Sequence, residues 1–370
     1  MSGASEVFRE AIRSFLSPIQ HLLDDESVTE VMINGPGDIW IEINGKIEKT
    51  DAQFRDEDTL RAAINNIAQS VGRTITEKEP RLDARLPNGY RIHAVLPPCA
   101  RNGTTVAIRK FASVQMSFKD YVQIGALTVD GAQFLDIAMK LGKNILVSGG
   151  TGSGKTTLLG VLCERIPPGQ RIIVIEDSSE LKVEYPHTVF FETRLADDHG
   201  TKEISVQDLL KSSLRLRPDR IIVGEVRGSE ALELIQAMNT GHKGCLGTVH
   251  ANSSSDALTR LEALAQGAES KVSERALRQQ ISSAIDLVVQ VSRFSDGSRR
   301  IADISEVRGF TSDGAYDVVS IYQMSRMVRQ QDGRLHGQLQ ATGEIPTFMD
   351  EIEDNQIPFA RAKFQAPKAA

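Results

Sequence analysis

The sequence is short of the residues on which several classes of protein depend. Its 370 residues include three cysteines, one tryptophan and only 5% aromatic residues. An odd number of widely spaced cysteines suits a reducing compartment rather than a disulfide framework, and it lacks the paired spacing of a zinc site. The few aromatics and a net charge of −6 speak against a nucleic-acid motor, which needs a basic groove with stacking side chains. The cysteines are Cys99, Cys163 and Cys245.

Long hydrophobic runs are also missing. No stretch approaches the ~18 apolar residues that a transmembrane helix requires. The first residues include Glu6 and Glu10 and no continuous apolar segment, so we expect no signal peptide. The composition, 40% hydrophobic and 25% charged, is that of a soluble globular protein, and the length suits two domains. We therefore expect a cytoplasmic protein. Docking on a membrane-bound partner is compatible with this expectation.

One glycine-rich stretch carries the clearest chemistry. The apolar run 145–147 predicts a buried strand, residues 149–156 fit the pattern G-x-x-x-x-G-K-[ST], and a helix is predicted to follow. In that context the backbone N–H groups approach a polyphosphate, Lys155 reaches its β- and γ-phosphates, and Thr156 binds Mg²⁺. A solvated turn is the alternative, but it does not require the full pattern with both flanks. The predicted nucleotide-binding residues are Gly150, Thr151, Gly152, Ser153, Gly154, Lys155, Thr156 and Thr157.

The hydrophobic periodicity divides the chain into five segments. Short alternating strands and one helix over 56–71 indicate a mostly antiparallel first domain, whereas strands that alternate with helices indicate a parallel sheet in the second. Ser205 and Ser253, each three residues before an aspartate, predict helix starts. The expected segments are an N-terminal helical segment (1–27), an α+β domain (28–112), a linker (113–130), an α/β domain (131–310) and a less regular tail (311–370).

Two carboxylates directly follow predicted core strands of the second domain. In open α/β sheets ligands bind beyond the carboxyl ends of the strands, so these positions are candidates for catalysis. Glu176, followed by Asp177, is placed to orient or deprotonate an attacking water. Glu225 follows a strand that resembles a Walker B motif with Gly224 in the usual aspartate position, and it would hold Mg²⁺ through water. The alternative for Glu176 is a carboxylate that caps a local turn.

Two histidines bracket the next strand. His250 follows it and is a candidate sensor of a γ-phosphate, while His242 precedes it and is the weaker candidate for nucleotide binding. An isolated histidine at a strand end is more often a hydrogen-bond partner, and that alternative stays open.

Four motifs together resemble one family. They are GGTGSGKTTLL, IEDSSEL, RIIVGEVRG and GTVHANSSSDALTRLE, and they are similar to the secretion ATPases of the type II/type IV superfamily, most of all to the tight-adherence (Tad, CpaF-type) pilus ATPases. The resemblance extends from about Val28 to about Gly309. It implies a RecA-like P-loop ATPase domain with a mainly parallel sheet, preceded by a smaller mixed α+β (PAS-like) domain. It also implies catalytic roles for Glu176, Glu225 and His250, and Mg²⁺ binding by Thr156 and Glu225.

The same resemblance assigns several arginines. Segments of the first domain are similar to those whose arginines reach nucleotide in the assembled ring of the family. Relatives of the Tad type carry a longer helical extension before this domain, so the N-terminal contacts are expected to differ. The implied residues are Arg91 and Arg109 as catalytic groups and Arg85 and Arg194 as further nucleotide ligands.

The resemblance also implies an activity and partners. We expect a homo-hexameric ATPase that uses ATP and Mg²⁺ to power pilus assembly or protein secretion through motion between its domains. Its expected place is the cytoplasm, peripheral to the inner membrane, with an inner-membrane platform protein as partner, indirect membrane contact and no nucleic acid. A type IV secretion ATPase that translocates substrate shares every motif and stays open, while a nucleic-acid motor or a non-hydrolysing scaffold fits less well.

Overall fold

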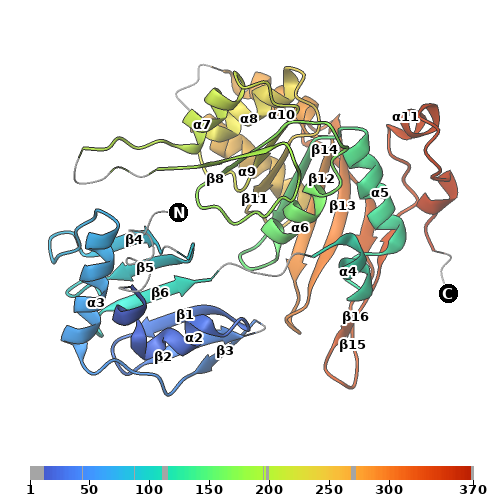
Figure 1. Ribbon diagram of the computed structural model, residues 1–370. Helices are drawn as coiled ribbons and strands as arrows, with labels where there is room; N and C mark the ends of the chain where they lie inside the picture. Colours follow the sequence, from blue (N-terminus) through green and yellow to red (C-terminus); the bar gives the residue numbers. More distant parts are fainter. Residues whose placement is uncertain are drawn as a thin grey trace. The chain divides into compact units, whose positions relative to one another are not determined.

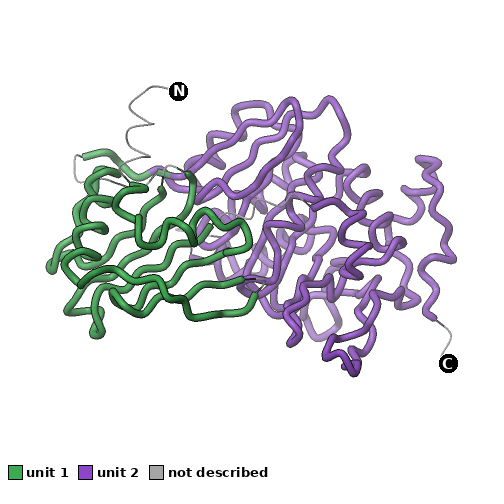
Figure 2. The backbone as a smooth tube through the Cα atoms, turned by 60° about the horizontal axis from the view of Figure 1, so that its bottom comes forward, with its two compact units in different colours: residues 1–114, 194–203 green, residues 115–193, 204–370 purple. Residues whose placement is uncertain are grey.

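The computed structural model describes residues 12–43, 45–86, 88–110, 116–194, 196, 200–267 and 272–367. The chain forms two compact units. The first contains residues 1–114 together with 194–203, and the second contains residues 115–193 and 204–370 (Figure 2).

The first unit is built on a six-stranded antiparallel sheet in the order β3-β2-β1-β6-β5-β4. The predicted helix over 56–71 is confirmed as α3, which buries Leu60, Ile64 and Ile67 in the core of this unit. Asp56 begins it by accepting a hydrogen bond from the N–H of Thr59. The elements are β1 (Val28–Asn34), β2 (Ile39–Ile43), β3 (Lys46–Lys49), α3 (Glu57–Ser70), β4 (Arg81–Arg85), β5 (Arg91–Val95) and β6 (Thr105–Arg109).

The predicted N-terminal helical segment lies partly outside the described residues. From residue 12 it is helical, and Pro18 falls in a short 3₁₀ turn, η1 (Ser17–Ile19), before α2 (Gln20–Asp24) begins. Proline cannot donate a backbone hydrogen bond within a helix, which accounts for the break at this point.

The second unit contains a nine-stranded sheet in the order β17-β14-β13-β12-β7-β11-β10-β8-β9 (Figure 1). The six strands from β12 to β9 are parallel, and β13, β14 and β17 continue the sheet in antiparallel fashion. The expectation of a mainly parallel sheet is therefore confirmed. The strands are β7 (Ile145–Gly149), β8 (Ile172–Glu176), β9 (Thr188–Glu192), β10 (Arg220–Val223), β11 (Leu246–Val249), β12 (Leu287–Arg293), β13 (Arg299–Phe310), β14 (Tyr316–Met324) and β17 (Leu339–Ala341).

Helices cover both faces of this sheet and create two cores. Alternate residues of the central strands enter opposite cores: Ile145 and Val147 pack with α5 and α6, whereas Leu146 packs with α7 to α10. The predicted helix starts are confirmed, because the side chains of Ser205 and Ser253 each accept a hydrogen bond from the N–H three residues on. The helices are α5 (Val129–Lys140), α6 (Lys155–Cys163), α7 (Val206–Ser213), α8 (Glu230–Asn239), α9 (Ser254–Gln266) and α10 (Glu274–Ala284).

Two segments are more ordered than the sequence suggests. The expected linker, 113–130, contains α4 (Phe118–Gln123), which begins with a reciprocal capping box between Ser117 and Asp120. The expected irregular tail, 311–370, supplies β14 and β17 to the main sheet and α11 (Met349–Asp354). Phe348 and Phe364 of this tail pack against Phe134 of α5, with ring centroids 5.7 and 5.6 Å apart. These contacts join residues far apart in sequence, so local periodicity does not reveal them.

Within the described ranges, every helix is too short or too polar to cross a lipid bilayer.

Candidate active site

Parallel pairing brings the ends of four strands to one edge of the large sheet. Strands β7, β11, β10 and β8 are neighbours in that order and run in the same direction. The glycine-rich loop follows β7, Glu176 ends β8, Glu225 follows β10 and His250 follows β11. The residues predicted to act on a nucleotide therefore share the carboxyl edge of one sheet, as ligand sites in such sheets do.

The glycine-rich loop leads directly into helix α6. Gly152 and Gly154 have φ values of 67° and 98°, a region that residues with a side chain rarely adopt, and Gly154 is the N-cap of the helix. The first turn of α6 contains Lys155, Thr156 and Thr157. Backbone N–H groups and the positive end of the helix dipole thus meet at the loop, which is the arrangement that binds phosphate.

Two cations hold the carbonyl oxygens of this loop. The Nζ of Lys155 donates to the carbonyl oxygens of Gly149 and Gly150, at 3.0 and 3.2 Å. From β13, the Nε of Arg299 donates to the carbonyl oxygen of Gly152 at 2.7 Å. A peptide carbonyl and the following N–H point in opposite directions, so anchoring the carbonyls orients the N–H groups of the loop.

Glu176 is a buried carboxylate with one oxygen anchored. Glu176 is only 4% exposed, and its Oε1 accepts hydrogen bonds from the N–H groups of Glu180 and Leu181, both at 3.0 Å. Burial raises the pKa of Glu176 to about 7, and the two N–H donors oppose that rise. Its Oε2 accepts no hydrogen bond from the described residues. A carboxylate with a pKa near neutrality and one available oxygen is suited to accept a proton from water.

Glu225 is held by an arginine two residues further along the chain. Its Oε2 accepts hydrogen bonds from the Nε and Nη2 of Arg227, at 2.9 and 2.5 Å. The Nη1 of Arg227 reaches the Oδ2 of Asp177 at 3.3 Å, so one guanidinium bridges the ends of β10 and β8. Gly224, the residue before Glu225, is fixed to the neighbouring strand β11, because the hydroxyl of Thr248 donates to its carbonyl oxygen at 2.7 Å.

The two histidines lie at opposite edges of the sheet. His250 is exposed at the carboxyl edge, where it makes no hydrogen bond with the described residues. His242 precedes β11 at the amino edge, where its Nδ1 lies 3.2 Å from the carbonyl oxygen of Ala237. The structure therefore does not bring His242 to the glycine-rich loop of its own chain, because the strand between the two histidines spans the sheet.

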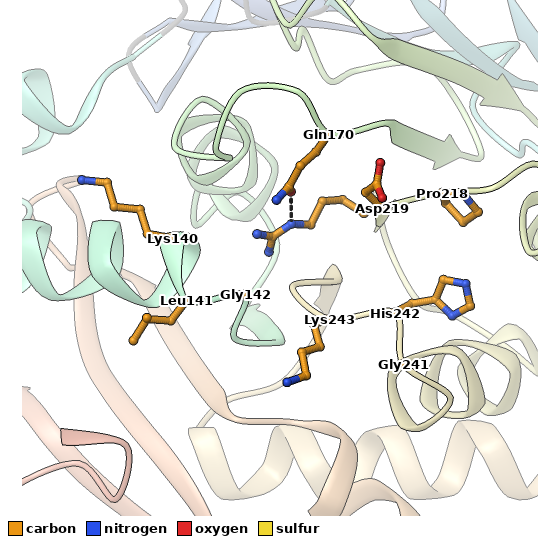
Figure 3. A pocket seen from close by; sticks show the side chains of 10 residues that line it. Lys140, Leu141, Gly142, Gln170, Pro218, Asp219, Gly241, His242 and Lys243 are labelled. Atoms are coloured by element: carbon orange, nitrogen blue, oxygen red, sulfur yellow. Dashed lines mark hydrogen bonds between the residues drawn. The ribbon is translucent and has the colours of Figure 1, made fainter. Parts of the chain in front are cut away.

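His242 instead lines a cavity of about 330 Å³ at the amino edge. Figure 3 shows its walls, which come from the end of α5, the starts of β8 and β10, and the turn before β11. Arg220 also lines the cavity; it is 3% exposed and donates to Gln170 and to the carbonyl oxygen of Met139. Lys140 and Arg220 lie at the C-terminal end of α5, whose negative dipole end their charges compensate.

The predicted arginines of the first unit form a row on its sheet. Arg85 lies opposite Arg91 across β4 and β5, and Arg91 lies opposite Arg109 across β5 and β6. Directly opposed residues point to the same face of a sheet, so the three side chains share a face. Asp83 binds one of them, with its Oδ2 2.9 Å from the Nη2 of Arg91.

Arg194 lies in the segment that groups with the first unit. Its Nε and Nη2 donate to the carbonyl oxygen of Lys202, at 3.3 and 3.2 Å.

The oxygen atoms at the carboxyl edge suit Mg²⁺. The hydroxyl of Thr156 and the Oε1 of Glu225 are oxygen ligands without a hydrogen-bond donor among the described residues, and hard cations prefer such oxygens. In the described part of the chain, no three His, Cys, Asp or Glu side chains are grouped so as to hold a metal ion by themselves. Mg²⁺ at this edge would therefore depend on phosphate oxygens and water as well.

Comparison with known proteins identifies the family. Residues 14–334 match the family described as type II/IV secretion system protein. The chain belongs to the type II/IV secretion system protein family.

Several known proteins are similar to this chain over most of their length. A putative conjugal transfer protein of Mycobacterium tuberculosis is 33% identical over 329 residues, which are 87% of this chain and 92% of that protein. The type IV secretion system protein PtlH of Bordetella pertussis is 32% identical over 331 residues, 82% and 97% of the two chains. The pilus retraction motor PilT, solved with ADP, shares the fold with a TM-score of 0.55 at 20% identity, covering 96% of this chain and 90% of that one.

The sequence analysis did not identify two arginines of the candidate site, Arg227 and Arg299. Arg227 stands in the same motif as Glu225, so its charge two residues beyond a strand-end carboxylate is a signal that could have identified it. Arg299 has no such signal, because it lies 147 residues from the loop carbonyl to which it donates.

Proposed function

We propose that this protein is an ATP-hydrolysing motor whose second unit is a RecA-like P-loop domain. The observation that carries the proposal is the shared sheet edge: the glycine-rich loop and the buried carboxylate Glu176 stand at the ends of parallel strands of one sheet. In this proposal, N–H groups of the loop and Lys155 bind the phosphates of ATP. The Oε2 of Glu176 accepts the proton of the attacking water, and His250 senses the γ-phosphate.

The metal and the ring complete the proposed site. Thr156 and, through water, Glu225 would hold Mg²⁺, which supplies positive charge to the β- and γ-phosphate oxygens. A homo-hexamer would bring Arg91, Arg109, Arg85 and Arg194 of one subunit to the nucleotide of another. We propose that such a ring works in the cytoplasm at the inner membrane, where it acts on a platform protein of a Tad-type pilus or secretion machine.

A second candidate is an ATPase that translocates substrate for type IV secretion or conjugation. The names of the similar proteins from B. pertussis and M. tuberculosis favour it. Both candidates use the same site, so the chemistry does not separate them. The neighbouring genes do: prepilin and platform proteins support the first, and conjugation components support the second.

The test of the shared proposal is phosphate release from ATP with and without Mg²⁺. The variant Lys155→Ala should lose turnover, because the charge that stabilises the β- and γ-phosphates is gone. Lys140→Ala is the matched control, since Lys140 lines the cavity at the opposite edge. Undiminished turnover in Lys155→Ala, or a wild-type chain that neither binds nor hydrolyses ATP, would overturn the proposal.

A further inference from the structure

Arg227 contacts two carboxylates that end different strands. Two of its nitrogens donate to one oxygen of Glu225, and the third donates to Asp177, which lies 50 residues earlier in the chain. A planar guanidinium with several fixed N–H groups can make this contact, whereas the single ammonium of lysine cannot reproduce its geometry.

The backbone that carries Arg227 is itself fixed. The Oε1 of Glu230 accepts hydrogen bonds from the N–H groups of Arg227 and Gly228, at 2.6 and 2.8 Å. Glu230 is buried and begins α8, so its carboxylate ties the loop to the start of a helix. The backbone from which the Arg227 side chain extends is therefore fixed by the fold, and Glu225 and Asp177 then hold its guanidinium.

The contact orients Glu225 without using both of its oxygens. Arg227 donates only to Oε2, and Oε1 accepts no hydrogen bond from the described residues. Glu176, at the end of β8, has the same arrangement of one anchored and one available oxygen. When one carboxylate oxygen is anchored, the orientation of the other is fixed as well. A carboxylate that accepts hydrogen bonds from the water molecules around a cation needs such a fixed orientation.

We propose that Arg227 is a positioning residue: it fixes Glu225 through Oε2 so that Oε1 is oriented toward the water shell of Mg²⁺, and it joins the ends of β10 and β8. The proposal rests on the proposed function, because it assigns Glu225 to a metal–nucleotide site. Arg227 acts through Glu225 and does not itself contact the nucleotide.

The experiment combines single and double variants of the full-length chain. Arg227→Gln removes the charge, and Arg227→Lys keeps the charge but lacks the planar guanidinium with its several N–H donors. Glu225→Gln removes the carboxylate that Arg227 positions. Arg217→Gln is the matched control, because Arg217 also pairs with a carboxylate two residues away, Asp219, but at the amino edge. The measurements are the affinity for a fluorescent ATP analogue with Mg²⁺ and with EDTA, the Mg²⁺ dependence of turnover, and the melting temperature.

The expected result is specific to the metal-bound nucleotide. Arg227→Gln should raise the Mg²⁺ concentration needed for half-maximal turnover by ~10-fold or more, and Arg227→Lys should restore little of it. Affinity for the analogue in EDTA and the melting temperature should change little, since half-exposed ion pairs contribute little to stability. The double variant Glu225→Gln with Arg227→Gln should be no worse than Glu225→Gln alone, because both act through one group.

Three outcomes would overturn the proposal while leaving the proposed function standing. The first is a wild-type Mg²⁺ dependence in Arg227→Gln. The second is a double variant whose loss is the product of the two single losses, which would mean that Arg227 acts on the nucleotide directly. The third is a fall in melting temperature together with an equal loss of affinity in EDTA, which would assign Arg227 a structural role. A wild-type chain without nucleotide binding or turnover would instead overturn the proposed function, and this proposal with it.

Discussion

The backbone of Gly224 lies directly against the side chain of Glu176. A Cβ atom at position 224 would be 2.8 Å from the Cγ of Glu176 and 3.3 Å from its Oε1. Aspartate is the usual residue at this place of a Walker B strand, and here its side chain would collide with the proposed proton acceptor. The glycine is therefore the local consequence of placing Glu176 at the end of the neighbouring strand.

This contact predicts the effect of the smallest possible side chain. Gly224→Ala should displace Glu176 and lower ATP turnover by ~10-fold or more, with a loss of stability of about 1–3 kcal/mol from overpacking. Nucleotide binding at the glycine-rich loop should persist. Gly160→Ala is the control, because a Cβ there lies 3.8 Å from the side chain of Leu181, an ordinary contact, and alanine favours a helix. Normal turnover in Gly224→Ala, measured by phosphate release, would contradict the contact as a constraint.

The raised pKa of Glu176 predicts how turnover depends on pH. A carboxyl group accepts a proton only when it is ionised, and the pKa of Glu176 is about 7. Turnover at saturating Mg-ATP should therefore rise with pH through about 7. Glu176→Gln should bind ATP normally, lose ~10²-fold in turnover and show no such rise. Equal losses of binding and turnover would assign Glu176 a structural or metal-binding role.

The same raised pKa predicts that the stability of the fold decreases as the pH rises, whereas turnover increases. Because burial raises the pKa of Glu176 from 4.5 to about 7, the folded chain binds more protons than the unfolded chain between these pH values. Stability contributed by this group is thus lost as pH rises through that range. Glu176→Gln, which mimics the protonated form, should be more stable than the wild type at pH 8, by on the order of 3 kcal/mol, and the difference should vanish below about pH 4.5. Denaturant unfolding at both pH values measures it, and a difference independent of pH would contradict the assignment.

The two histidines provide a matched pair of variants. His250→Ala at the carboxyl edge should weaken the coupling between hydrolysis and domain motion more than it weakens nucleotide affinity. His242→Ala at the amino edge should leave both unchanged. Since His250 makes no hydrogen bond with the described residues, its replacement should alter stability by no more than about 0.5 kcal/mol. Inter-domain fluorescence and nucleotide titration give the readouts, and equal effects of the two variants would remove His250 from the mechanism.

The row of arginines in the first unit predicts complementation between inactive subunits. Lys155→Ala has a dead site with intact arginines, whereas Arg91→Ala with Arg109→Ala has an intact site without them. If a guanidinium of one subunit stabilises the phosphoryl group bound by another, mixed rings should regain partial ATPase activity. Rings shown to contain both subunits, yet silent, would count against action between subunits. A ring whose subunits must hydrolyse ATP in strict order would also be inactive. In that case a low fraction of Lys155→Ala subunits should abolish the ATPase activity of wild-type rings.

The sequence by itself determined the local features of this protein. The pattern around Lys155 predicts strand, loop and helix because each needs only neighbouring residues, and Ser205 and Ser253 predict helix starts for the same reason. Parallel strands place their carboxyl ends at one edge, so Glu176 and Glu225 could be assigned to the site from their places after apolar runs.

Only the tertiary structure decided which distant residues meet. The contact of Arg299 with the loop spans 147 residues, and that of Arg227 with Asp177 spans 50. The order β7-β11-β10-β8 places Gly224 against Glu176. Apolar periodicity tells which face of an element is buried but not which element lies beside it, because strand order is set by the packing of the whole sheet and its helices.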